Sequence, residues 1–138
     1  MRTLSLFAFL AVAVNASPTW SCSCIAPPPP KTALAKSAAV FLAKVVDIER
    51  GKRQYEVTFE ISRTWKGTRG KNVTVHTALS GAACGYGFKK GKSYLVYCYQ
   101  AKKDGKPIGP MRTNICTRTK PLERAKADLK ELGEGKKP

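Results

Sequence analysis

The sequence has little histidine and lacks the common catalytic motifs. It contains one histidine, His76, and it has no HExxH zinc motif, no CxxC pair and no phosphate-binding P-loop. A Ser-His-Asp triad would have to include His76, and no local motif supports one. His76 lies in a segment of alternating polar and apolar residues, where a lone histidine is usually a packing or surface residue. We therefore expect a protein that is not an enzyme and has no cofactor of its own.

The sequence also lacks a hydrophobic run long enough to span a membrane. Its longest run, Leu4 to Val14, has 11 residues, whereas a transmembrane helix needs about 20. Arg2 precedes the run and a polar stretch containing Pro18 follows it, which is the pattern of a secretory signal peptide. We therefore assign residues 1–21 to a signal peptide and predict a secreted, extracellular protein with no membrane span.

The point of signal cleavage decides which residue begins the mature chain. Small residues occupy the first and third positions before the cut at residues 14–16 (VNA) and at residues 19–21 (TWS). The first site would release Ser17 and the second would release Cys22. The local pattern leaves both sites open.

Acidic residues are scarce: there are 9 Asp and Glu against 25 Lys and Arg in 138 residues. Without residues 1–21 the chain has 117 residues and, since Arg2 is removed, 24 basic residues against 9 acidic ones, a net charge of +15. Such a charge attracts polyanions, and export argues against nucleic acid as the partner. The candidates that remain are sulfated glycans, anionic cell surfaces and acidic partners. For a heparin-like glycan we expect the contact at the basic loop that contains Lys89, Lys90 and Lys92, and the alternative is that this loop is ordinary solvated surface.

Most of the remaining chain is predicted to form β-strands. Residues 55–65 alternate between apolar and polar side chains, which is typical of a strand with one face in water. The run at 39–49 is rich in β-branched residues and indicates a mostly buried strand. The predicted strands are 39–49, 55–65, 72–78, 93–100 and a short one at 112–116. Residues 80–93 are predicted as an irregular, glycine-rich connection, and residues 102–110 as a cluster of turns.

Two helices are predicted beside these strands. Residues 32–39 form a short helical turn with Thr32 as its cap. Residues 121–133 form a terminal helix with Pro121 near its start and Gly133 at its end, and we expect residues 134–138 to be a disordered tail. Several strands with no strand-helix-strand alternation predict one all-β barrel domain with an accessory helix.

Five cysteines follow the signal peptide: Cys22, Cys24, Cys84, Cys98 and Cys116. In a short exported chain such a count indicates a disulfide framework. An odd number leaves one thiol over. The residues alone allow many pairings, so the connectivity stays open at this point.

The stretch CSCIAP at 22–27, followed by more prolines and a later CGY at 84–86, resembles the N-terminal, netrin-like domain of the tissue inhibitors of metalloproteinases. In that family the mature chain begins Cys-Thr/Ser-Cys-Val-Pro, followed by further prolines and a short helix. The resemblance covers most of residues 22–118 and also includes FLAKVVDI at 41–48, YEVTFEISRTWKG at 55–67 and TNICTRT at 113–119.

The resemblance implies an OB-like five-stranded β-barrel over residues 22–138, with a flanking short helix and a C-terminal helix. It also implies the disulfides Cys22–Cys84 and Cys24–Cys116, which would leave Cys98 as the free thiol. The sequence departs from the family in three ways, of which the first is that Cys98 has no counterpart in the animal inhibitors. Leu34 stands near the place where a cysteine of a third bridge would be expected, and the six-cysteine C-terminal subdomain is absent.

The resemblance further implies inhibition of zinc metalloproteinases of the matrix metalloproteinase type. The free amine and the carbonyl oxygen of Cys22 would bind the catalytic zinc of the target enzyme. Ser23 would face the pocket beyond the scissile bond and Ile25 the next subsites, while Ala82 and Ala83 would contact the protease from the other side. These inhibitory residues are together called the wedge: Cys22, Ser23, Cys24, Ile25, Ala82 and Ala83.

A second function stays open beside inhibition. Netrin-like domains with an extended N-terminus bind matrix or partner proteins and inhibit nothing, so the chain could instead be a basic binding module for sulfated glycans or an extracellular partner. Cys22 as the first residue favours inhibition, whereas Ser17 favours the module. In either case we expect a monomer. Asn72-Val73-Thr74 is a glycosylation sequon.

Overall fold

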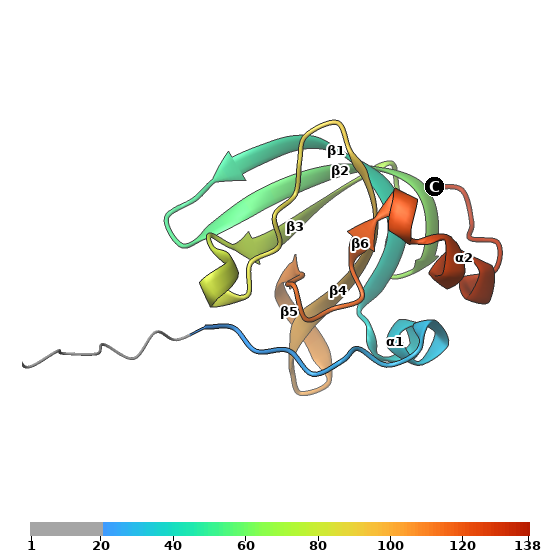
Figure 1. Cartoon of the computed structure of the whole chain (residues 1–138), viewed down its shortest axis with the longest axis horizontal. Coiled ribbons are helices and arrows are strands. Elements are labelled where there is room, and N and C mark those ends of the chain that lie inside the picture. The colour runs from blue at the N-terminus through green and yellow to red at the C-terminus, as the bar shows by residue number, and fades with distance from the viewer. Residues whose placement is uncertain (1–20) are drawn as a thin grey trace, which may run out of the picture.

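The computed structural model describes residues 21–138 (Figure 1). The predicted signal peptide, apart from Ser21, lies outside the described residues. The strands are β1 (Ala39–Arg50), β2 (Gln54–Lys66), β3 (Asn72–Ala78), β4 (Ser93–Lys103), β5 (Lys106–Arg112) and β6 (Lys120–Pro121). The helices are α1 (Pro30–Lys36) and α2 (Lys126–Leu132), with short 3-10 turns η1 (Gly81–Ala83) and η2 (Leu122–Arg124).

The sheet closes on itself to form a barrel. Its strand order is β1-β2-β3-β5-β4, and β4 pairs again with β1, so that five strands form a ring. The β3–β5 contact is parallel and joins His76 to Arg112, whereas every other pairing described is antiparallel. The short strand β6 is added to the side of β4. The predicted all-β, OB-like five-stranded barrel is confirmed.

Strand β1 is irregular, and its bulges bend the sheet where the barrel closes. Its register with β2 shifts at three places, between Val40 and Phe41, between Leu42 and Ala43, and between Val45 and Asp47. Such bulges bend a strand and increase its twist. The bend lets β1 pair with β4 along residues 39–44 while it stays paired with β2.

The barrel interior is apolar because alternate residues of each strand point inward. In β2, Val57, Phe59 and Ile61 are buried, while Glu60 between them is exposed. The rings of Phe41 and Phe59 meet edge to face with centroids 5.8 Å apart. The periodicity of residues 55–65 in the sequence is therefore the periodicity of this core.

Strand β4 is buried on both of its faces. Residues 94–98 are all buried, and Leu95 and Tyr97 on the outer face belong to a second apolar cluster with Ala33 of α1 and Ala125 beside α2. The two helices lie on the same side of the barrel and contact each other (Figure 1). Within residues 21–138, no helix has both the length and the apolar character needed to cross a membrane.

Two helix boundaries differ from the sequence-based prediction. Helix α1 begins at Pro30, and Thr32 lies inside it with no side-chain capping bond; proline at the first position presets the backbone for the helix. Helix α2 begins only at Lys126, since Pro121 is paired in β6 and residues 122–124 form a 3-10 turn. The predicted end at Gly133 is correct, and this glycine has a φ of 70°.

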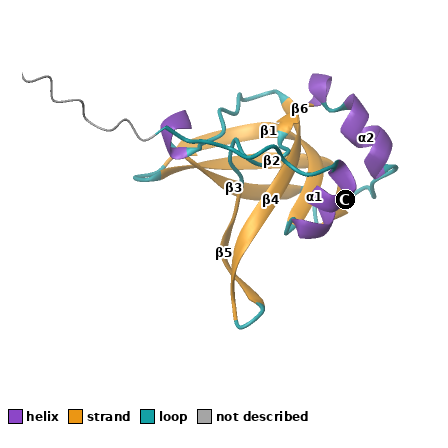
Figure 2. Cartoon of the chain, turned by 60° about the horizontal axis from the view of Figure 1, so that its bottom comes forward, coloured by secondary structure: helices purple, strands orange, loops and turns teal. Residues whose placement is uncertain are grey.

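The fifth strand was predicted at the wrong place. It covers Lys106–Arg112, within the segment that was expected to be turns, whereas residues 113–116 belong to the loop that follows. Asp104 and Gly105 both have positive φ, of 50° and 74°, and Lys103 pairs with Lys106 across them. Asp-Gly is a strong signal for a two-residue hairpin turn. The resulting β4–β5 hairpin projects from the barrel (Figure 2).

The expected disordered tail is also wrong. Lys136 pairs with Thr64 of β2 through two backbone hydrogen bonds of 2.8 Å each. The indole N–H of Trp65 donates to the carbonyl of Gly133 at 3.1 Å, and Gly135 lies against the Trp65 ring. The C-terminal residues therefore extend the edge of β2.

This pairing makes a testable prediction about the last residues of the chain. Deleting residues 134–138 should lower the free energy of unfolding by about 1–3 kcal/mol, because two backbone hydrogen bonds and the cover over Trp65 are lost. Urea denaturation would measure the change. Deleting only residues 137–138 is the matched control and should leave the stability unaltered. Equal stability of the two truncated proteins would contradict the role of Lys136.

Candidate functional site

The segment before α1 has no regular secondary structure. Residues 21–29 run along the outside of the barrel toward α1, and at their start they pass near η1 (Figures 1 and 2). Pro27, Pro28 and Pro29 cannot donate to a strand ladder because proline has no backbone N–H. The segment is held instead by disulfides and by one arginine side chain.

Two disulfides anchor the first cysteines of the segment. Cys22 is bonded to Cys84 and Cys24 to Cys116, with Cα–Cα distances of 5.2 and 5.1 Å. These are the two pairs that the family resemblance implies. The bridges lie side by side, since the sulfurs of Cys22 and Cys116 are 3.8 Å apart. Ser23, between the two anchored residues, is left exposed.

The sulfur cluster is not a metal site in this oxidised form. The Sγ atoms of Cys22, Cys24 and Cys116 all lie within 4.8 Å of one another. A cysteine binds metal as a thiolate, and all three of these sulfurs are already in disulfide bonds. The cluster therefore serves to hold the chain.

The side chains of the wedge other than its two cysteines are exposed to solvent. Ile25 is 91% exposed, the highest exposure among the large apolar residues of the described chain. Ala82 and Ala83, in η1, are exposed as well. An isoleucine that covers no core surface remains available for contact with a partner.

The turn that carries Ala82 and Ala83 has a fixed local structure. The hydroxyl of Ser80 accepts a hydrogen bond from the N–H of Ala83 at 3.4 Å, and Cys84 takes a left-handed conformation with a φ of 63°. Gly85 follows, and a Cβ there would lie 2.1 Å from the carbonyl oxygen of Ala78. Only glycine therefore fits where the chain turns back against the end of β3.

The loop that contains Cys116, the partner of Cys24, is hydrogen-bonded to the turn at η1. The N–H of Ile115 donates to the carbonyl of Cys84 at 3.0 Å. The Asn114 side chain accepts from the N–H groups of Cys116 and Thr117 at 2.9 and 3.1 Å, which is an Asx turn. Cys84 and Cys116, to which the N-terminal segment is bonded, therefore lie in two loops that a backbone hydrogen bond joins to each other.

Arg118 connects the proline segment to helix α2. Its Nη1 donates to the carbonyl of Pro28 at 2.9 Å, while its Nε and Nη2 donate to the carboxylate of Asp128 at 2.8 and 2.7 Å. Lys120 also donates to Asp128, at 2.9 Å, and so does the hydroxyl of Tyr97, at 3.2 Å. Asp128 is buried on α2, so one carboxylate orients the arginine that holds the segment.

Burial and the charges in this network shift the pKa values of Asp128 and Tyr97. Burial by itself would raise the pKa of Asp128, but the hydrogen bonds and positive charges of Arg118 and Lys120 outweigh it and lower that pKa below its usual value. Burial raises the pKa of Tyr97, and the nearby Asp128 carboxylate raises it further. The network therefore holds a charged carboxylate and a neutral phenol at neutral pH.

Sequence reasoning did not find Arg118 or Asp128 as positioning residues. A signal for Asp128 was present, because it lies three residues after Ala125 and so falls on the apolar face of the predicted terminal helix. An acidic residue at such a position needs a buried partner. Nothing local in the sequence indicates that Arg118 would reach Pro28.

The lysines proposed for glycan binding lie in the loop before β4. Lys89 and Lys92 are exposed, and Lys90 forms an ion pair of 3.0 Å with Asp47. One of the three charges is therefore already matched by an acid. Asn72, in the sequon, is exposed at the first residue of β3.

Cys98 is the free thiol, and it is buried in β4. Burial raises the pKa of its thiol. It therefore behaves as a small apolar core residue.

Comparison with models of known protein families gives no match, and comparison with curated proteins finds no similar sequence. The likeness to the tissue inhibitors therefore stands on the residues quoted above.

The buried carboxylate makes a prediction about acid stability. A lowered folded-state pKa means that Asp128 stabilises the fold above its unfolded pKa, about 3.9, and that this contribution is lost as the pH falls through the folded value. Asp128→Asn should lower the free energy of unfolding at pH 7 by about 1.5–3 kcal/mol. It should also flatten the fall in stability between pH 7 and acid.

Denaturation at several pH values would measure both effects. Asp47→Asn is the matched control, because it removes an exposed carboxylate that has one lysine partner, and it should have little effect. If Asp128→Asn lost stability toward acid as steeply as the unaltered chain, the Asp128 network would not cause the pH dependence.

Proposed function

We propose that this chain is a secreted inhibitor of zinc metalloproteinases and that it acts once residues 1–21 have been removed. The observation that supports the proposal is the exposed segment from Cys22 to Ile25, which two neighbouring disulfides attach to the barrel beside η1. The free amine of Cys22 and its carbonyl oxygen would form a five-membered chelate with zinc. A catalytic zinc keeps one coordination position open for such ligands.

The attachment of the segment supports tight binding. Cys22 and Cys24 are bonded to the barrel, and Arg118 holds the carbonyl of Pro28 a few residues further on. A segment that is already ordered loses less conformational entropy when it binds. The side chains of Ser23 and Ile25 would then enter the substrate cleft, with Ala82 and Ala83 against its other wall.

Blocking the amine of Cys22 tests the proposed chelate. Only a neutral amine has a lone pair to give to zinc, and an unperturbed α-amine titrates at roughly 7.7–8.0. Acetylating a chain that begins at Cys22, or placing one alanine before it, should weaken inhibition of a zinc protease by several orders of magnitude. Inhibition constants against a matrix metalloproteinase would measure this.

Both changes leave the two disulfides intact, so circular dichroism and thermal unfolding should be unaltered and serve as the control. An acetylated protein that inhibits as strongly as the free one would show that Cys22 is not the zinc ligand. N-terminal sequencing of the secreted chain tests the same proposal independently, since a chain that begins at Ser17 has no free Cys22 amine.

The excess of positive charge favours a second function, binding of sulfated glycans. Ion pairs among residues 21–138 involve the basic side chains of Lys90, Arg118 and Lys120, so most lysines and arginines have no acidic partner. We propose the loop with Lys89, Lys90 and Lys92 as a contact for a heparin-like polyanion. This function is compatible with inhibition and also with a module that does not inhibit.

Neutralising the loop tests the glycan contact. Changing Lys89, Lys90 and Lys92 together to glutamine should lower the salt concentration needed for elution from immobilised heparin, because attraction between exposed charges is screened by salt. The triple change of Lys102, Lys103 and Lys106 on the β4–β5 hairpin removes the same charge and is the control. Equal losses in the two proteins would mean that binding follows net charge and not this loop.

A further inference from the structure

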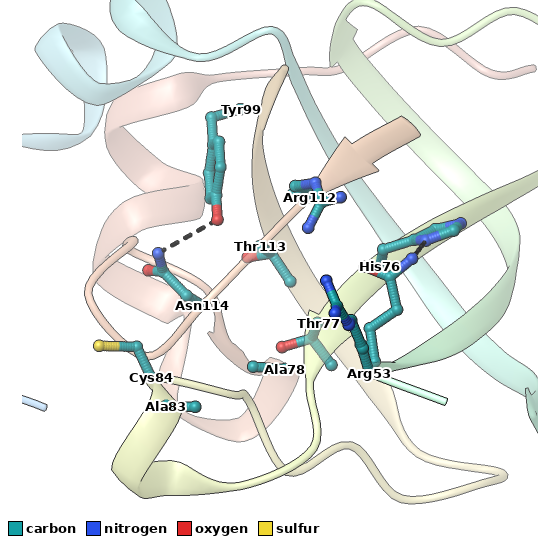
Figure 3. Close-up of a pocket in the computed structure, with 11 residues that line it drawn as sticks. Arg53, His76, Thr77, Ala78, Ala83, Cys84, Tyr99, Arg112, Thr113 and Asn114 are labelled. Atoms are coloured by element: carbon teal, nitrogen blue, oxygen red, sulfur yellow. Dashed lines mark hydrogen bonds between the residues drawn. The ribbon is translucent and has the colours of Figure 1, made fainter. Parts of the chain in front are cut away.

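A cavity of about 380 Å³ lies beside the turn that carries Ala83 and Cys84 (Figure 3). Its polar side chains come from the end of the β1–β2 connection, from β3, and from the end of the β4–β5 pair. The residues that matter here are Arg53, Gln54, His76, Tyr99, Arg112 and Asn114.

The closure of the barrel brings the basic side chains of this cavity together. The parallel contact of β3 with β5 places His76 opposite Arg112, and Tyr99 of β4 pairs with Arg112 from the other side. Arg53 comes from the short connection between β1 and β2. In Figure 3, Arg53, His76 and Arg112 lie on one side of the cavity, with Asn114 and Tyr99 on the other.

The positive charge of the cavity has no acidic counterpart. Its lining contains two arginines and the histidine but no aspartate or glutamate. Within residues 21–138, neither Arg53 nor Arg112 forms an ion pair. Glu56 lies opposite His76 in the register of β2 and β3, but its side chain does not line the cavity. Two like charges beside one cavity repel each other, and a bound anion would relieve that repulsion.

Neutral hydrogen-bonding groups complete the lining. The amide of Gln54 is hydrogen-bonded to Nδ1 of His76, which leaves Nε2 of the ring for another partner. The Asn114 amide lies 3.5 Å from the hydroxyl oxygen of Tyr99, so the hydroxyl hydrogen remains available to donate. Both arginines are exposed enough to move toward a ligand.

We propose that this cavity binds a tetrahedral oxyanion, a sulfate or phosphate group, through Arg53, Arg112 and His76. The planar guanidinium group of arginine donates two parallel hydrogen bonds to such oxygens, which makes paired arginines suitable ligands. The volume accommodates the anionic group and part of the molecule that carries it. The site shares no residue with the Lys89–Lys92 loop. The site does not use the amine of Cys22, although Ala83 of the wedge and Cys84, which is bonded to Cys22, also line the cavity.

The proposal is tested by titrating the full chain with inorganic phosphate and with sulfate at constant ionic strength. The ring signals of His76 and the Nε–H signals of the arginines, observed by NMR, should shift and saturate. In the double variant Arg53→Gln/Arg112→Gln, the affinity derived from the His76 signals should fall at least tenfold. The control Arg63→Gln/Arg69→Gln removes the same charge from exposed residues outside the cavity and should bind as the unaltered chain does.

A sulfated disaccharide serves as a second probe and distinguishes the source of the anion. Tighter binding than free sulfate at the same three residues would assign the site to a glycan sulfate ester. Binding of the free ions without the disaccharide would assign it to a small ion. Thermal unfolding of both double variants checks that they are folded.

Two results would overturn the proposal. One is the absence of saturable shifts at His76 with every probe. The other is an equal loss of affinity in the control, which would show that the anions respond to net charge and not to this cavity.

Discussion

The double pairing of strand β1 is the constraint on which the rest of the molecule depends. Because bulges bend β1, it pairs with β2 along most of its length and with β4 along residues 39–44, and the sheet closes. Closure requires β3 to meet β5, at His76 and Arg112. The loops that follow these two strands, with Cys84 in one and Cys116 in the other, are then held close enough to be joined through the carbonyl of Cys84.

The N-terminal segment is positioned by that closed barrel. Its prolines exclude it from the sheet, so backbone pairing cannot fix it. Two disulfides with sequence separations of 62 and 92 residues fix it instead, together with the hydrogen bond from Arg118 to Pro28. The segment can therefore remain extended and exposed, and yet have a defined position. An extended, exposed and fixed segment is what a substrate-like inhibitor needs.

The sequence predicted best those features that depend on neighbouring residues. The alternation of Val57, Phe59 and Ile61 placed β2, and Gly133 placed the end of α2, because both signals are local. The pairing of Lys136 with Thr64 and the contact of Arg118 with Pro28 join residues far apart in the chain, and no local pattern indicates them.

The N-terminal disulfides and the basic cavity also differ in how far a local sequence pattern can indicate them. The two disulfides of the N-terminal segment were expected from the family resemblance, because Cys22 and Cys24 lie together in the motif that carries it. His76 alone indicated only an ordinary strand residue. Its two arginine neighbours are supplied by the β1–β2 connection and by β5, and they meet only when the barrel closes.

The free cysteine bears on the stability of the disulfides, because Cys98 lines the same small hollow as Cys116. Exchange with a disulfide requires a thiolate, and burial raises the pKa of Cys98. The raised pKa therefore keeps the Cys98 thiol protonated and disfavours its exchange with the neighbouring Cys24–Cys116 bridge.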